Sequence, residues 1–166
     1  FPTRRSSDLN LFAKITHDFS NNTKLSAEVT YLDYLAQQSG GLTDYLFKEN
    51  PYQSNRKRNW FGLNWLLYNI KFEHSFSEKS NISINIFGLD AERKAIGFRS
   101  NRVGQIDSNK ERDLIKGDFN NHGIEIRWLQ NYPLGNKKAV FLVGGKYYNA
   151  KNTSAQGPGS SASDAD

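Results

Sequence analysis

The chain has 166 residues, a net charge of +5 and 13% aromatic residues, mostly Phe and Tyr. It contains no Cys, which excludes disulfides, thiolate metal sites and cysteine nucleophiles. No segment approaches the roughly 20 consecutive apolar residues of a membrane-spanning helix, so the sequence offers no candidate for one.

The first eight residues, Phe1–Asp8, are polar, follow no pattern and resemble translated sequencing-adapter sequence. We expect a non-native or disordered leader there and leave it out of the fold. The chain also lacks Met and any segment with the basic start, apolar middle and small-residue cleavage site of a signal peptide. We therefore expect an internal fragment of a longer protein.

Two segments near the N-terminus predict a β-hairpin. In residues 9–19 the odd-numbered positions are mostly apolar and the even-numbered ones mostly polar, as expected for a strand with one apolar face. The same pattern continues in residues 25–31, after the polar turn Ser20–Thr23. A third strand, about Asn59–Phe76, changes phase near Leu66–Tyr68, where we predict a β-bulge.

Three further strands follow the same alternation. The fourth is centred on Ile82–Ile86, the fifth on Ile124–Trp128, and the sixth runs over about Ala139–Asn149. The polar face carries charges in the middle of strands, namely Glu28, Glu125 and Arg127. Aromatic residues lie near many strand ends, which is typical of the interfacial girdles of membrane barrels.

The connections between these strands alternate in length. The short turns are Ser20–Thr23, Ser77–Asn81 and Pro133–Lys137, and the long loops are about Gln37–Lys57, about Lys94–Asp118 and Lys151 onward. Transmembrane β-barrels sort their connections in this way, with short periplasmic turns and long extracellular loops. The predicted fold class is therefore all-β, with antiparallel hairpins from a transmembrane barrel.

Six strands are too few to close such a barrel, since the smallest have eight. We therefore predict that residues 9–150 form three hairpins of a larger barrel and that residues 151–166 are an extracellular loop fragment. The alternative is a soluble or surface-exposed β-sandwich that acts as a binding or adhesin module. An outer-membrane enzyme is a third hypothesis.

The most specific segment is Leu35–Trp65, which contains QSGGLTD at 38–44, NPYQSNR at 50–56 and RNWF at 58–61. These pieces, in this order, resemble TonB-dependent outer-membrane receptors, in particular the ferric-citrate (iron dicitrate) receptor group. The resemblance implies a parent protein with a 22-stranded barrel, a plug and a TonB box, of which the plug and the TonB box are not visible here. It also implies import of an iron chelate, contact with the TonB complex through the plug, and location in the outer membrane of a Gram-negative bacterium.

Basic residues gather at the ends of the long loops. Ferric citrate is anionic, and Arg binds carboxylates in a bidentate way that Lys cannot reproduce. We therefore predict five ligand-facing residues: Arg56, Arg58, Arg93, Arg99 and Arg102. The alternative is that these charges contact lipopolysaccharide phosphates, or that they only solvate the loops.

The chain carries no recognisable catalytic motif. The three histidines, His17, His74 and His122, form no HExxH motif, and no nucleophile elbow or phosphate-binding loop is present. The basic residues alternate with acids, so nucleic-acid binding is not expected. We expect no enzyme activity, no metal site and no resident cofactor, with the ferric chelate as the transported ligand and membrane lipid and lipopolysaccharide as further partners.

Overall fold

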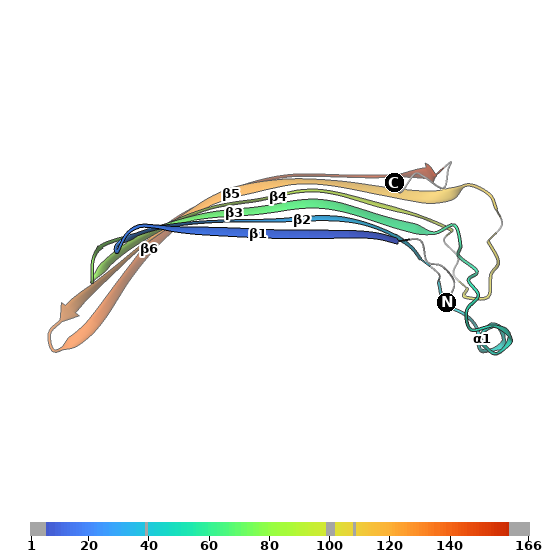
Figure 1. Cartoon of the computed structure of the whole chain (residues 1–166), viewed down its shortest axis with the longest axis horizontal. Coiled ribbons are helices and arrows are strands. Elements are labelled where there is room, and N and C mark those ends of the chain that lie inside the picture. The colour runs from blue at the N-terminus through green and yellow to red at the C-terminus, as the bar shows by residue number, and fades with distance from the viewer. Residues whose placement is uncertain (1–5, 39, 99–101, 108, 160–166) are drawn as a thin grey trace.

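The computed structural model describes residues 6–38, 40–98, 102–107 and 109–159. The elements are β1 (Ser6–Ser20), β2 (Thr23–Gln37), α1 (Asp44–Glu49), β3 (Trp60–Ser77), β4 (Ser80–Gly97), β5 (Arg112–Leu134) and β6 (Lys137–Gly159). The strands form one antiparallel sheet in chain order (Figure 1). The prediction of an all-β chain of antiparallel hairpins is confirmed. The described residues contain no second sheet, which a sandwich would need.

The short and long connections lie at opposite ends of the sheet. Figure 1 shows the turns β1–β2, β3–β4 and β5–β6 at one end, and α1 with the long connections at the other. Gly135 in the β5–β6 turn has a φ of 60°, a left-handed conformation that Gly adopts without strain. We call the described residues among 38–59 the first loop and the described residues among 98–111 the second loop. The predicted sorting of the connections is therefore present in the structure.

Two predicted boundaries differ from the structure. β1 begins at Ser6, which pairs with Ala36, so the end of the expected leader belongs to the sheet; residues 1–5 lie outside the described residues. β6 continues to Gly159, which pairs with Arg112, so the expected loop from Lys151 onward is strand as far as the structure describes it. Its polar composition hides this, because the alternation of apolar residues stops while the pairing with β5 continues.

One face of the sheet carries a band of exposed apolar side chains, and we call it the belt face. One row of paired residues across the sheet consists of Ile15, Ala27, Ile70, Ile86, Ile124 and Tyr147. Ile15 is 70% exposed and Ile126 in the same band is 43% exposed. Such a row of side chains needs a cover that the described residues do not provide.

We call the other face the reverse face, and it carries charged side chains in the rows next to the apolar row of Ile15. Lys14 pairs with Glu28 at 3.4 Å, and Arg127 pairs with Glu125. These residues alternate along their strands with the belt residues, so the sheet separates an apolar surface from a polar one. The predicted one-sided pattern is confirmed for the part of the sheet nearest the short turns.

The predicted bulge near Leu66–Tyr68 is wrong. β3 pairs without a register shift from Trp60 to His74 with β2, and its only shift against β4 lies between Ser75 and Ser77. The change of phase has another cause. Near the turns, the apolar side chains of β3 lie on the belt face, whereas near the loops the odd-numbered ones, such as Leu63, lie on the reverse face.

The part of the chain that the structure describes has almost no buried core. Among the described residues, the buried hydrophobic side chains are Ala91 and Ile96. The accessible surface is 11932 Å² for a mass of 18.9 kDa, whereas a compact monomer of that mass exposes about 8,300 Å². A large part of the surface that a globular domain would bury is therefore open on this sheet.

Candidate functional site

The first and second loops meet at the loop end of the sheet, and Arg56 lies between them. Its side chain is only 7% exposed. Nη1 donates hydrogen bonds to the carbonyls of Asn55 (2.8 Å) and Gln105 (2.7 Å), and Nη2 donates one to the carbonyl of Arg102 (3.4 Å). The guanidinium carbon lies 5.1 Å from the centre of the Phe98 ring, which is a cation–π contact.

Arg58 forms a bidentate ion pair with Asp107 of the second loop. Nε and Nη2 donate to the two carboxylate oxygens at 2.8 and 2.6 Å, and Nη2 also donates to the Lys110 carbonyl at 3.0 Å. The hydrogen bond from Arg58 lowers the pKa of Asp107 below its usual value of 3.8, and the same bond raises the pKa of Arg58. Both groups therefore remain charged at neutral pH.

Arg112, which we had not predicted as a site residue, completes this group. It is 4% exposed at the start of β5, and its Nη1 donates to the Arg58 carbonyl. The sequence places it in a basic stretch at the end of a loop, where its neighbours Lys110 and Lys116 are exposed. Arg112 differs from Lys110 and Lys116 in that it is buried against Arg58, a contact between residues 54 positions apart in the sequence.

The five predicted ligand-facing arginines fall into different environments. Arg56 and Arg58 contact the second loop, as described above. Arg93 is exposed on the reverse face of β4, where it pairs with Leu63 and Gly117, and Arg102 is exposed in the second loop. Arg99 lies outside the described residues. The structure thus brings two of them into the junction between the loops and leaves two on the surface.

The first loop contains an unpredicted helix, α1. The Thr43 hydroxyl accepts a hydrogen bond from the Leu46 amide at 3.3 Å and caps the helix, and Asp44 lies in the first turn, where the helix dipole favours an acid. The Thr43-Asp44 pair was the signal available in the sequence. A two-residue signal is weak, because Thr and Asp are also common in loops and turns.

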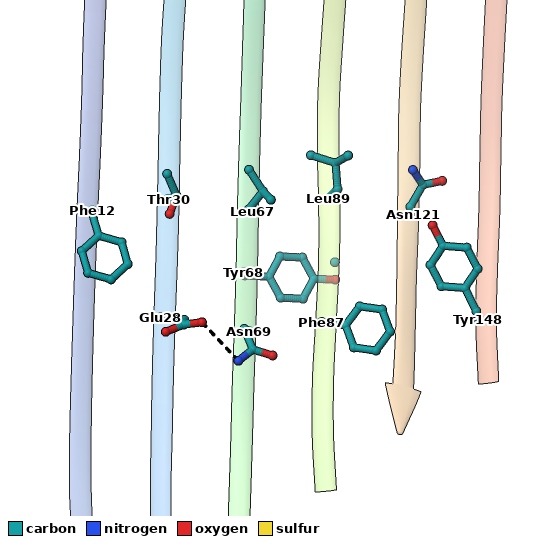
Figure 2. A pocket seen from close by; sticks show the side chains of 11 residues that line it. Phe12, Glu28, Thr30, Leu67, Tyr68, Asn69, Phe87, Leu89, Asn121 and Tyr148 are labelled. Atoms are coloured by element: carbon teal, nitrogen blue, oxygen red, sulfur yellow. Dashed lines mark hydrogen bonds between the residues drawn. The ribbon is translucent and has the colours of Figure 1, made fainter. Parts of the chain in front are cut away.

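The reverse face holds a groove of about 360 Å³ that crosses the strands (Figure 2). Phe12, Leu67 and Leu89 point into it from one row, and Glu28 and Asn69 from the next, joined by a hydrogen bond of 3.3 Å. At the β5–β6 side, Phe87 stacks on Tyr148 with ring centres 6.2 Å apart, and the Lys146 ammonium lies 4.9 Å from the centre of the Phe87 ring. The groove is amphipathic, so it fits a surface that carries both apolar and polar groups.

The described residues show no group of three or more His, Asp or Glu side chains that could bind a metal ion. The three histidines lie apart from one another. His17 contacts Phe19, and His122 is exposed on β5. Nδ1 of His74 forms a hydrogen bond of 2.8 Å with the Thr23 hydroxyl. No described helix has the length and apolarity required to cross a membrane.

Comparison with known proteins gives a structural relative. No family model matches the chain, and no curated protein matches it by sequence. Its fold is similar to part of the crystal structure of the ferric citrate transporter FecA in the unliganded form, with a TM-score of 0.78 and 18% sequence identity. The similarity covers 93% of this chain and 22% of the transporter, so the chain spans about a fifth of that protein's length. The chain therefore has the fold of a segment of a ferric citrate transporter.

Proposed function

We propose that this chain is part of the wall of a TonB-dependent outer-membrane receptor that imports an anionic iron chelate, with ferric citrate as the first candidate. In this proposal the belt face contacts lipid, the reverse face lines the lumen, and the long loops form the extracellular mouth. The observation that carries the proposal is the slope of the apolar band across the sheet.

The upper border of the band, on the side of the long loops, falls from β1 to β4 and is then level from Ile86 of β4 through Ile124 of β5 to β6. On β1 it is Leu9, six positions above Ile15, whereas on β6 it is Tyr147, which lies in the same row of pairs as Ile15. Six residues rise about 20 Å, and five strand spacings cover about 24 Å, so the line from Leu9 to Tyr147 makes an angle of about 40° with the rows. Strands of membrane barrels are tilted by about 35–45°.

The height of the band agrees with the same membrane. From Leu9 to Phe19 on β1, and from Ile124 to Leu134 on β5, the band extends over ten positions, whereas on β4 it is shorter, from Ile82 to Ile86. Ten residues span about 33 Å along a strand, which a tilt of about 40° reduces to about 25 Å along the membrane normal. This is the height of the apolar band of outer-membrane barrels. A sheet in water would not require an apolar band with this slope and this height.

Phe19 and Phe76 end the band on β1 and β3, where aromatic residues are expected at a lipid interface. The belt-face side chains near the short turns include Phe19, Phe76, Trp128 and Phe141, and all four are exposed. Trp128 packs edge-on against Phe141 with ring centres 6.0 Å apart, and its indole nitrogen donates to the Ser80 hydroxyl at 3.0 Å.

Single-cysteine labelling tests the lipid assignment, because the chain has no natural Cys. Ile70→Cys on the belt face and Lys71→Cys on the reverse face are adjacent and equally deep. In the membrane-inserted protein, we expect a spin label at residue 70 to be relaxed by oxygen, which concentrates in acyl chains, and a label at residue 71 by a water-soluble nickel complex. Equal accessibility of both labels to the nickel complex would contradict the proposed lipid contact.

The choice of chelate is tested at the exposed arginines. In the complete receptor, replacement of Arg93 and Arg102 by Ala should weaken ferric-citrate binding, because a guanidinium–carboxylate contact typically contributes about 1.5–3 kcal/mol. Lys48→Ala in α1 is the control, since it removes one positive charge from an exposed helix. Unchanged affinity in both arginine variants would reject them as ligand contacts, and an equal loss in the control would indicate a general effect of charge.

A further inference from the structure

We propose that the first and second loops form one conformational unit, in which Arg56 and Arg58 are positioning residues that set the conformation of the second loop. This inference goes beyond the proposed function, since it concerns how the loops are held whatever they bind. It predicts that displacement of the first loop also displaces the second.

The hydrogen bonds between the loops run mainly in one direction. The side chains of Asn55, Arg56 and Arg58 in the first loop donate, and backbone carbonyls of the second loop accept. The four acceptors are the carbonyls of Arg102, Val103, Gln105 and Lys110. The described part of the second loop has no helix or strand of its own, and its carbonyls use donors from the first loop. The Arg102 carbonyl also accepts from the Gln105 amide of its own loop at 3.1 Å.

Arg56 is suited to this role because it is buried and has several donors. A guanidinium presents five N–H groups in a rigid plane, and here they reach carbonyls in both loops. A charge that is 7% exposed is costly unless its donors are paired. Movement of the second loop would leave this charge without the Gln105 and Arg102 carbonyls, so the two loops are energetically coupled.

The first loop is shaped to accommodate the Arg56 side chain. Gly40 has a φ of +70°, and a Cβ added there would lie 2.5 Å from Cγ of Arg56. The backbone at Gly40 therefore packs against the aliphatic part of Arg56, in a left-handed conformation that Gly adopts without strain. Gly41 approaches Val103 of the second loop, since an added Cβ would lie 3.5 Å from Cγ1 of Val103.

Three further contacts hold the junction near the strand ends. Arg58 holds Asp107 through the bidentate pair, and the carbonyl of Arg58 accepts from Arg112, which begins β5. At the other side, the Phe98 amide donates to the Asn59 side chain at 2.8 Å. The second loop is thus attached to the first near both of its ends and in its middle.

The test measures amide hydrogen exchange in the second loop after substitutions in the first loop. In the membrane-inserted protein, Arg56→Met keeps the aliphatic stem and removes the donors. Because at least two hydrogen bonds to the second loop are lost, we expect exchange of the Gln105 amide, which is bonded to the Arg102 carbonyl, to accelerate by about tenfold or more. Lys48→Ala, in the same loop and away from the junction, should leave this exchange unchanged.

A change confined to the first loop, with the Gln105 amide still protected in a folded Arg56→Met protein, would overturn the proposal. If Arg56→Met prevents folding, Asp107→Asn provides the same test from the second loop, since it removes the charge and keeps the shape. It should increase exchange at Gln105 and at the amide of Asn59, which is bonded to the Arg56 carbonyl. No increase at Asn59 would show that the loops are independent and would overturn the coupling.

The charge swap Arg58→Asp with Asp107→Arg tests whether the ion pair itself, and not local packing, couples the two loops. Both single replacements place two like charges together and should loosen the second loop, whereas the double replacement restores opposite charges and should recover part of the protection. A double variant no better protected than either single variant would overturn the role of the pair.

Discussion

Arginine has two roles at the loop end of this sheet. Arg56, Arg58 and Arg112 bind carbonyls and a carboxylate within the protein, whereas Arg93 and Arg102 are exposed. The residue type alone cannot distinguish the two groups, because the same planar fork fits a loop carbonyl, a carboxylate side chain and a ligand carboxylate. Burial and partners separate them.

The Arg58–Asp107 pair gives a prediction for pH. A carboxylate whose pKa is lowered in the folded state stabilises the loops above its usual pKa, and this contribution is lost as pH falls through the lower folded value. We therefore expect the junction to be insensitive to pH from neutrality down to about 4. As the pH falls below 3.8, the usual pKa of the Asp107 carboxyl, the junction should loosen.

The measurement is the carboxyl ¹³C titration of Asp107. Replacement of Arg58 by Ala should move the midpoint up toward 3.8, because the hydrogen bond from Arg58 is the largest cause of the shift. A midpoint that stays where it is in the unmodified protein would contradict this cause.

A second residue-scale prediction concerns Gly123, where side chains and backbone leave no room. A Cβ added there would lie 2.7 Å from Cζ of Phe87 and 2.8 Å from the carbonyl oxygen of Tyr147 on the neighbouring strand. Gly123→Ala should destabilise the protein by about 1–3 kcal/mol, because the strand backbone cannot move aside easily. Gly145→Ala on β6 is the matched control, since nothing lies within 4 Å of its added Cβ. Equal urea midpoints for the two variants would contradict the steric argument.

At the scale of the element, β3 shows how one strand can be apolar on both faces without a bulge. Its belt-face residues near the turns, such as Ile70, face one environment, and its reverse-face residues near the loops, such as Leu63, face another. The two apolar stretches lie at different heights. Strand periodicity alone reads this as a shift of register, because it assumes a single environment along the whole strand.

The belt gives a prediction for single strands. Ile84→Arg places a charge in the middle of the β4 part of the belt, where an arginine at the bilayer midplane costs about 2–4 kcal/mol. Asn85→Arg places the same charge one position away on the reverse face and should cost much less. The measurement is reversible unfolding from lipid vesicles. Equal losses for both variants would contradict the assignment of the faces.

At the scale of the whole molecule, the described residues form a single-layer sheet with two open edges. β1 and β6 each have one paired neighbour, and the large apolar belt is uncovered. An exposed edge strand pairs readily with another chain, and an exposed belt associates with other apolar surfaces. Both features need cover from lipid or from further strands.

The full chain in detergent-free buffer should therefore associate, whereas detergent micelles should keep it dispersed by covering the belt. Sedimentation of the same preparation with and without detergent measures this. A stable monomer in detergent-free buffer would contradict the single-layer structure, because such a monomer would have to bury the belt against something within the chain.

Sequence periodicity was sufficient for the architecture near the short turns. Residues such as Ile82 and Ile84 alternate with polar neighbours, and short-range alternation directly reports a strand with one wet and one apolar face. It was insufficient near the loops, where β6 continues to Gly159 through a polar segment. Pairing there is held by backbone hydrogen bonds with β5, which leave no pattern in the side chains.

The sequence by itself determined the all-β class, the hairpin order, and the short and long ends of the sheet, because each of these depends on local alternation and turn chemistry. Only the tertiary structure decided the tilt of the belt and the roles of the arginines. The tilt depends on the register between strands, and the contacts of Arg56 and Arg58 depend on residues roughly 50 positions away, such as Gln105 and Asp107. Contacts over such separations are set by how the strands pair.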